Sequence, residues 1–269
     1  MTHSAILLVA YGTAEAHHAE SLGLFEQKVR RNFPETCVRR AFTSPRVRKQ
    51  LTASGKSADS VHEALARLRL ENFTHITVQS LHLIPGREYR RMLEEIGLAA
   101  QRDVQGALKG DISVGSPLLN SEEDIEQAAG ALLQSLPAER AGSDIALWIG
   151  HGSGHAGKNF YALLQQSAQK LDKNILIGTL EEGLEQILPE IQKRAAKKIW
   201  LLPLLSVAGK HSREDMAGTH DASWRSRLEL NNCRCLPVAR GLIEYPAFTD
   251  LWIRHLREAR LTAHQGVRA

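Results

Sequence analysis

The sequence predicts an α/β protein made of two similar doubly wound domains, each built on a parallel sheet. Along its 269 residues, short apolar segments alternate with longer amphipathic ones. Strands separated by helices form parallel sheets with right-handed crossovers. The alternation runs twice, and a small polar segment at residues 137–143 separates the two runs. We therefore expect domains at residues 1–136 and 137–269, with the final helix able to pack back on the first domain.

The two halves carry the same order of turns. In the first half, an apolar strand leads into Tyr11-Gly12-Thr13 and a later one into Gly86-Arg87-Glu88. In the second half, Gly150-His151-Gly152 and Gly209-Lys210-His211 follow strands in the same way. Ligands of doubly wound folds bind at the carboxyl ends of the strands. Two such halves facing one another would form a cleft with ionisable groups at the strand ends.

In the first half, the spacing of apolar residues and the positions of turn-forming residues predict where each strand and helix lies. Pro34 ends helix 15–32. The apolar residues on or near one face of this helix are Leu22, Leu24, Phe25, Val29 and Phe33. Helix 121–135 starts after Asn120 or Ser121, with acids in its first turn that a cap and the helix dipole favour. The expected strands are 5–10, 37–42, 76–83 and 112–114, and the expected helices are 15–32, 45–51, 60–70, 87–102 and 121–135.

The pattern restarts after residue 143, again with short apolar runs between amphipathic segments. The expected strands are 145–150, 175–178, 198–205 and 233–236, and the expected helices are 159–171, 182–196, 211–216, 222–230 and 246–260. Cys233 and Cys235 fall in the last of these strands. The spacing of metal-binding cysteines is more often two to four residues, so we interpret this pair as alternating strand residues.

Composition excludes several classes of protein. The net charge is only +4, aromatic residues make up 5%, and no block of Lys and Arg resembles a nucleic-acid-binding arm. The longest N-terminal apolar stretch, residues 5–10, is too short for a signal-peptide core or for the roughly 20 residues of a membrane helix. We expect a cytoplasmic protein without nucleic-acid or membrane partners. The sequence neither requires nor excludes a homo-oligomer.

Three strand ends of the second half offer metal ligands. His151 follows one strand between two glycines, which leave the imidazole uncrowded. Glu181 follows the next strand, and His211 closes the third. Glu182 is expected to be a first-turn acid favoured by the helix dipole. Two imidazoles and one carboxylate suit Co(II), Fe(II), Ni(II) or Zn(II) and leave coordination positions open. Open positions indicate exchange or catalysis.

A dinucleotide site is the alternative. The segment from Gly152 to Gly157 matches G-x-G-x-x-G, and Glu181 lies where a ribose-binding acid would be expected. The first-half counterpart after Gly12 lacks these glycines. This interpretation also leaves His211 and Glu88 without roles, so we favour the metal site.

These motifs together resemble the anaerobic-type sirohydrochlorin cobaltochelatases, class II chelatases related to the ferrochelatases. The similarity spans nearly the whole chain in order. It is carried by residues 6–13, 39–44, 81–89, 150–152, 178–181, 207–211 and 215–218. The resemblance implies a chelatase-like pair of Rossmann-like α/β domains that hold a tetrapyrrole in an active-site cleft between them.

The resemblance also implies residue roles. His151 is the expected proton acceptor and a metal ligand, Glu181 and His211 complete the metal site, and Glu88 is a further active-site acid. The implied catalytic residues are therefore His151, His211 and Glu88. The implied activity is insertion of Co(II) into sirohydrochlorin in cobalamin biosynthesis, without an organic cofactor. Fe(II) insertion for sirohaem, or use of Ni(II), remains open. A non-catalytic tetrapyrrole or metal carrier is a further alternative.

Basic groups at the strand ends suit a polycarboxylate substrate. Arg46, Arg87 and Lys210 are candidates to hold the carboxylates of sirohydrochlorin by charge-assisted hydrogen bonds. The first half would mainly hold the macrocycle, with the turn Tyr11-Gly12-Thr13 as a further substrate-binding candidate. The metal chemistry would then be concentrated in the second half.

Overall fold

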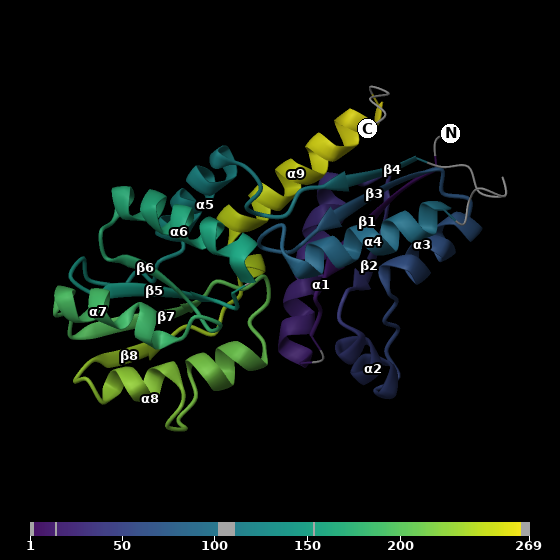
Figure 1. The fold of residues 1–269 in the computed structure, drawn as a ribbon. Coiled ribbons are helices and arrows are strands. Elements are labelled where there is room, and N and C mark those ends of the chain that lie inside the picture. Colours follow the sequence, from purple (N-terminus) through teal and green to yellow (C-terminus); the bar gives the residue numbers. More distant parts are fainter. Residues whose placement is uncertain (1–2, 14, 102–110, 153, 265–269) are drawn as a thin grey trace. The chain divides into compact units, whose positions relative to one another are not determined.

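The chain forms two compact α/β units in the computed structural model (Figure 1). The structure describes residues 3–13, 15–101, 111–152 and 154–264. Residues 1–120 and 249–269 make up the first unit, and residues 121–248 make up the second. Each unit contains a four-stranded sheet whose paired strands are all parallel. The predicted fold class, two halves with parallel sheets, is confirmed.

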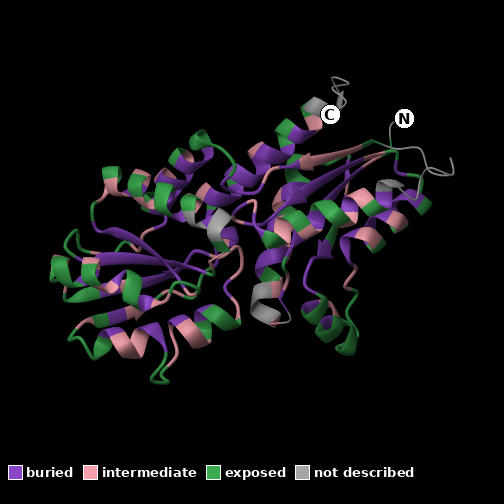
Figure 2. Cartoon of the chain, in the orientation of Figure 1, coloured by how far each residue is buried: buried purple, intermediate pink, exposed green. Residues whose placement is uncertain are grey.

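The first unit carries a sheet with the strand order β2-β1-β3-β4. Its central strand, β1, is buried almost throughout because helices cover both faces (Figure 2). The strands are β1 (Ser4–Ala10), β2 (Cys37–Phe42), β3 (His75–Ser80) and β4 (Asp111–Gly115). The helices are α1 (Ala16–Asn32), α2 (Pro45–Ala53), α3 (Val61–Leu70) and α4 (Arg87–Gln101), joined by part of α9 (Pro246–His264).

Alternation along the strands divides the core of the first unit into two layers. Leu7 and Val78 pack with α3 and α4 on one face of the sheet. On the other face lie α1 and α9 (Figure 1), where the rings of Phe25 and Trp252 are 6.2 Å apart. Lys28 of α1 also forms an ion pair of 2.7 Å with Asp250 of α9. These contacts place most of the last helix in the first unit.

The second unit repeats this topology with the strand order β6-β5-β7-β8. Helices α5 and α6 lie on one face of the sheet, and α7 and α8 on the other (Figure 1). The strands are β5 (Ile145–Gly150), β6 (Ile175–Thr179), β7 (Lys198–Pro203) and β8 (Arg234–Pro237). The helices are α5 (Glu122–Gln134), α6 (Gly154–Leu171), η2 (Leu184–Gln186), α7 (Leu188–Arg194), η3 (Ser212–Met216), α8 (Trp224–Glu229) and η4 (Leu242–Glu244).

The structure divides the chain earlier than the predicted boundary at residues 136 and 137. Helix α5 packs against α6 and so belongs to the second unit. Its capping box, formed by Ser121 and Asp124, starts the helix directly after the division at Asn120. The polar segment 137–143 is therefore a loop within the second unit. A loop rich in small polar residues looks the same in sequence whether or not a domain boundary crosses it.

Two predicted elements of the second unit differ from those observed. Residues 182–196 do not form one helix, because Gly183 has a φ of 82° and Pro189 lies in the first turn of a new helix, giving η2 and then α7. Helix α6 begins at Gly154, five residues before the predicted start. The segment read as a possible dinucleotide loop therefore falls largely within the first turns of a helix.

Hydrogen bonds at the strand ends show that the two units are equivalent in detail. The N–H of Ser44 donates to the carbonyl of Tyr11, and the N–H of Glu181 donates to the carbonyl of His151. In the same way, Arg90 N–H donates to Gly86, as Arg213 N–H does to Gly209. Counting from these pairs aligns the positions of the two halves. Tyr11 corresponds to His151, Ser44 to Glu181, and Glu88 to His211.

Candidate metal and substrate site

The turn after β5 is shaped by the two glycines that flank His151. A Cβ at Gly150 would lie 2.6 Å from Cε1 of Tyr161, and a Cβ at Gly152 would lie 2.5 Å from Cβ of Glu181. Gly152 also has a φ of 96°, a conformation that side chains disfavour. Both positions therefore need glycine. The tight turn brings Tyr161 and Glu181 against the backbone on either side of an exposed His151.

Tyr161 packs against the turn that carries His151. Its side chain is buried on α6, and its phenol oxygen is in hydrogen-bonding contact with the backbone of Gly152. Burial, with smaller contributions from the charges of Glu181 and Glu182, raises the pKa of the Tyr161 phenol to about 12. The phenol therefore stays neutral across the physiological range. We interpret Tyr161 as a fixed support for the His151 turn.

The carboxylate of Glu181 lies at the N-terminus of α6. Its two oxygens accept from the N–H of Gly154 at 3.0 and 3.2 Å. A helix N-terminus favours negative charge, so this placement is stabilising. In a dinucleotide site, the N–H groups at this helix N-terminus would bind the pyrophosphate. The Glu181 carboxylate already lies there, which argues against the dinucleotide alternative.

His211 lies beside His151 and is oriented by a carboxylate. The two imidazole rings are 4.9 Å apart between centroids, with an interplanar angle of 79°. Nδ1 of His211 lies 2.6 Å from Oδ2 of Asp215. In the neutral ring, a proton shared with Asp215 at Nδ1 leaves the Nε2 lone pair available. A carboxylate behind a histidine is the usual arrangement for a metal-binding imidazole.

The local helix geometry makes this pair possible. His211 precedes η3, a single π-helical turn in which the N–H of Ala217 donates to the carbonyl of Ser212. Such turns are rare and often occur at functional sites. His211 and Asp215 are four residues apart, the spacing at which side chains on one helical face meet. A short helix was predicted at 211–216, and its π-helical form is seen only in the structure.

The three predicted metal ligands are only partly brought together. Among the described residues, no group of three His, Cys, Asp or Glu side chains is arranged to hold a metal ion. The two imidazoles are adjacent, whereas the Glu181 carboxylate is bonded to Gly154. Glu182 accepts from the hydroxyl of Thr179 at 3.1 Å within its own turn. Of the two neighbouring acids, Glu181 is thus the one beside the His151 turn.

The corresponding turn of the first unit has different chemistry. Tyr11 takes the place of His151 and is half exposed. Gly12 has the same φ of 96° as Gly152, and a Cβ there would lie 2.7 Å from the ring of Phe42. Thr13 is buried, and its hydroxyl accepts from the N–H of Glu15. These groups are neutral, so among the described residues this turn offers a phenol where its counterpart offers an imidazole.

The other predicted site residues lie at the same strand ends of their own units. Glu88 is in the first turn of α4, and its buried Oε2 has no hydrogen-bond partner among the described residues. Arg87 beside it is strongly exposed, with Nε 3.8 Å from Oε1 of Glu88. Arg46 is exposed in the first turn of α2. Lys210 makes a 3.5 Å ion pair with Glu214.

The cysteine pair does not form a metal site with other described residues. Cys235 is buried in β8, and burial raises the pKa of its thiol to about 12. Burial also raises the pKa of the Cys233 thiol, which contacts the carbonyl of Ala196. Metals bind the thiolate, so both shifts disfavour binding. The interpretation of these residues as strand positions fits the structure.

Sequence reasoning missed the two supporting residues, Tyr161 and Asp215. Asp215 follows His211 at helical spacing, a signal that could have paired them. Tyr161 offered no comparable signal, because its position against Gly150 depends on the packing of α6 on the sheet.

Comparison with known proteins identifies the family of the chain. The family model described as cobalt chelatase (CbiK) matches residues 4–260. The chain is 42% identical over 261 residues to the sirohydrochlorin cobaltochelatase CbiKC of Nitratidesulfovibrio vulgaris strain Hildenborough, covering 96% of this chain and 91% of the relative. It is 29% identical to a sirohydrochlorin cobaltochelatase of Salmonella typhimurium strain LT2, covering 95% and 96%.

A solved structure shows the same fold. The sirohydrochlorin chelatase SirB of Bacillus subtilis subspecies spizizenii, in complex with cobalt, matches with a TM-score of 0.67 and 16% identity over 98% of this chain and 97% of that one. No helix among the described residues is long and apolar enough to cross a membrane. The family match extends over both units and includes every candidate ligand, so this chain belongs to the cobalt chelatase (CbiK) family.

Proposed function

We propose that this protein inserts Co(II) into sirohydrochlorin. The observation that carries the proposal is the pair of adjacent imidazoles at strand carboxyl ends, in a chain that belongs to the cobalt chelatase family. Both curated relatives described above are named for this activity. Insertion requires that water leave the metal and that two pyrrole protons leave the macrocycle. Imidazoles suit both tasks, because a neutral ring binds a metal and can also accept a proton.

In this proposal, His151 and His211 receive the metal as substrate, and His151 also accepts a pyrrole proton. Asp215 fixes the tautomer of His211 so that Nε2 faces the metal. Glu181 supplies negative charge that offsets part of the hydration the metal loses. To coordinate it directly, Glu181 would exchange its contact with Gly154 for one with the metal. That exchange would make metal binding reversible, as a chelatase needs.

Residues of the first unit would act on the macrocycle. We propose that Glu88, which occupies the position equivalent to His211, is a further acid in the reaction. Its unpartnered buried oxygen supports a role beyond packing. Tyr11, Gly12 and Thr13 would contact the macrocycle. Arg46 and Arg87, together with Lys210 of the second unit, would bind its carboxylates. The exposure of Arg46 and Arg87 supports this assignment.

The test is an anaerobic chelation assay with the purified protein, sirohydrochlorin and Co(II). The absorbance spectrum should change faster than in the uncatalysed control, through many turnovers per protein. Parallel reactions with Fe(II) and Ni(II) would rank the metals, since a site of this kind tolerates several divalent ions. A folded protein without acceleration would refute the proposal. A stable one-to-one complex without turnover would instead indicate a carrier.

A further inference from the structure

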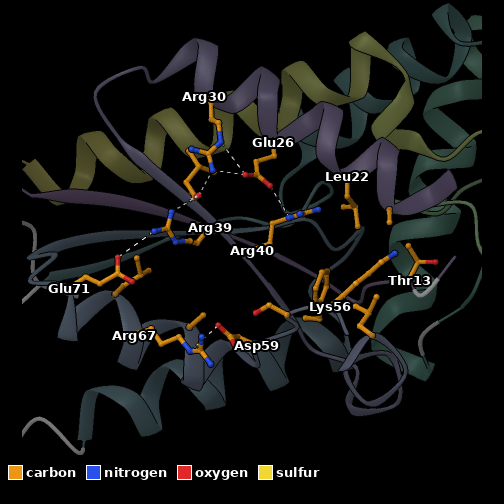
Figure 3. Close-up of a pocket in the computed structure, with 17 residues that line it drawn as sticks. Thr13, Leu22, Glu26, Arg30, Arg39, Arg40, Lys56, Asp59, Arg67 and Glu71 are labelled. Atoms are coloured by element: carbon orange, nitrogen blue, oxygen red, sulfur yellow. Dashed lines mark hydrogen bonds and ion pairs between the residues drawn. The ribbon is translucent and has the colours of Figure 1, made fainter. Parts of the chain in front are cut away.

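A cavity lies within the first unit, along the free edge of its sheet. It has a volume of about 530 Å³ and runs beside β2, the edge strand, between α1 on one side and α2 and α3 on the other (Figure 3). Its size is within the range of small-molecule sites, about 300–1,000 Å³. The candidate metal ligands His151, Glu181 and His211 do not line it. We call this cavity the β2 groove.

The floor of the β2 groove is apolar. Leu22 of α1, Phe42 of β2 and Leu68 of α3 line it and are all buried. Some of the backbone hydrogen-bonding groups along the free edge of β2 already have partners within the protein. The N–H of Phe42 donates to the carbonyl of Asp59, and the guanidinium of Arg30 donates to the carbonyl of Val38 at 2.6 Å. These bonds disfavour the addition of another strand, so a small molecule suits the groove better than an extended peptide.

The rim of the β2 groove has an excess of positive charge. Guanidinium and ammonium groups outnumber carboxylates among its lining residues. The basic residues are Arg30, Arg39, Arg40, Lys56 and Arg67, and the acidic residues are Glu26, Asp59 and Glu71.

The carboxylates leave part of this charge unbalanced. Glu26 forms ion pairs with two guanidiniums, those of Arg30 at 2.6 Å and Arg40 at 2.8 Å. Lys56 has no ion pair with any described residue. Its side chain extends along the groove on the side where Thr13 lies (Figure 3). One shared carboxylate and one unpaired ammonium thus give two positive charges without a partner of their own.

The remaining ion pairs offer little competition to a ligand. Arg39 and Glu71 are 3.4 Å apart and both about half exposed, and Arg67 pairs with Asp59 at the same distance. Exposed pairs of this kind contribute about 0–1 kcal/mol. An anion in the groove can therefore share these guanidiniums without breaking a strong interaction.

We propose that the β2 groove binds a small organic dianion with an apolar body. The apolar part would lie on the floor formed by Leu22, Phe42 and Leu68, and the anionic groups would reach Arg40 and Lys56. Either a phosphate or a pair of carboxylates meets this requirement. The site contains none of the proposed metal ligands and shares Thr13 with the proposed macrocycle contacts. Binding there requires neither cobalt nor a tetrapyrrole.

The proposal is tested by calorimetric titration of the full chain without metal or tetrapyrrole. The probes are phenyl phosphate and phthalate, which place a phosphate or two carboxylates on one ring, with inorganic phosphate and benzyl alcohol as partial probes. At least one ring-bearing dianion should bind with a Kd below about 1 mM, and at least tenfold more tightly than either partial probe. The ratio between the two dianions identifies the preferred anionic group.

Two charge-reversed variants locate the binding. Lys56→Glu should weaken binding of the preferred probe at least tenfold. Lys49→Glu is the matched control, because Lys49 is an exposed lysine on neighbouring α2 that does not line the groove, and binding should be unchanged. Circular dichroism verifies that both variants fold. The proposal is overturned if neither dianion binds, if inorganic phosphate binds as tightly, or if Lys56→Glu binds like the wild type. Chelation assays play no part, so failure here leaves the proposed function untouched.

Discussion

The carboxylate of Asp215 holds the imidazole of His211, with Oδ2 and Nδ1 2.6 Å apart. The same imidazole lies edge to face with that of His151. Asp215 therefore engages Nδ1 of His211, and in the proposed function Nε2 binds the metal. This relationship links the π-helical turn η3 to the proposed chemistry, and it leads to the first two predictions.

Replacing His151 should abolish chelation. We expect His151→Ala to lose Co(II) insertion while it binds the tetrapyrrole about as well as the wild type, because the imidazole acts on the metal and the proton. Steady-state turnover and a separate tetrapyrrole titration measure the two effects. His75→Ala is the control, since His75 lies at the amino end of β3 and away from the strand ends that carry the site. A His151→Ala enzyme with wild-type turnover would remove its proposed role.

Replacing Asp215 should weaken the metal site without removing it. Loss of a carboxylate behind a metal-binding histidine typically costs about 10–100-fold in affinity or activity. We expect Asp215→Ala to lose turnover within that range, mainly through weaker Co(II) binding. Asp215→Asn should recover part of it, because its amide oxygen can still accept from Nδ1 of His211. Asp221→Ala removes another exposed carboxylate, six residues further along the chain, and should behave like the wild type. Equal activity in Asp215→Ala and the wild type would contradict the assignment.

The turn after β5 should not tolerate a side chain at Gly152. A Cβ there meets Glu181 at 2.5 Å, and the φ of 96° disfavours any residue other than glycine. We expect Gly152→Ala to lose about 1–3 kcal/mol of unfolding free energy and most of its activity, as Glu181 is displaced. Gly130→Ala, in a helix with open space around it, should stabilise the protein by up to about 1 kcal/mol. Denaturant unfolding compares the two, and equal stabilities would refute the argument.

Acid should destabilise the protein through a buried histidine of the first unit. His82 lies after β3, with Nδ1 2.9 Å from the hydroxyl of Ser80, and burial lowers its pKa from 6.5 to about 4. Between these values the unfolded chain binds a proton that the folded chain does not, so stability falls as the pH drops from 6.5 to 4. The full loss is about 3 kcal/mol, at 1.36 kcal/mol per pH unit.

The His82 effect is measured as a difference between proteins. Unfolding free energies of the wild type and His82→Gln, followed from pH 7 to 4, should converge as the pH falls. His75→Gln replaces a more exposed histidine and should keep the pH dependence of the wild type. Parallel pH profiles for the wild type and His82→Gln would show that His82 does not titrate as inferred.

The duplication explains how one fold presents two different sets of side chains at the carboxyl ends of its strands. Backbone hydrogen bonds at the strand ends are the same in both units, yet Tyr11, Ser44 and Glu88 stand where His151, Glu181 and His211 stand. The fold fixes where a side chain emerges, and the residue at that position decides its chemistry. Metal-binding residue types are therefore concentrated in the second unit.

The sequence alone determined the architecture and the candidate ligands. Parallel strands follow from the alternation of apolar runs and amphipathic helices, and strand ends meet at one edge of a sheet whatever the details of packing. His151, Glu181 and His211 could therefore be proposed from their positions after three strands. The resemblance of the surrounding motifs to sirohydrochlorin cobaltochelatases pointed to the family that the comparisons then showed.

Only the tertiary structure decided how those ligands are held. The packing of Tyr161 against Gly150 and the contact of Glu181 with the N-terminus of α6 depend on atoms brought together from different elements. The π-helical form of the turn that carries Asp215 was likewise seen only in the structure. The division at Asn120 likewise follows from α5 packing against α6. Local patterns report period and turn chemistry within a segment. They carry no information about which distant side chain fills the space beside it.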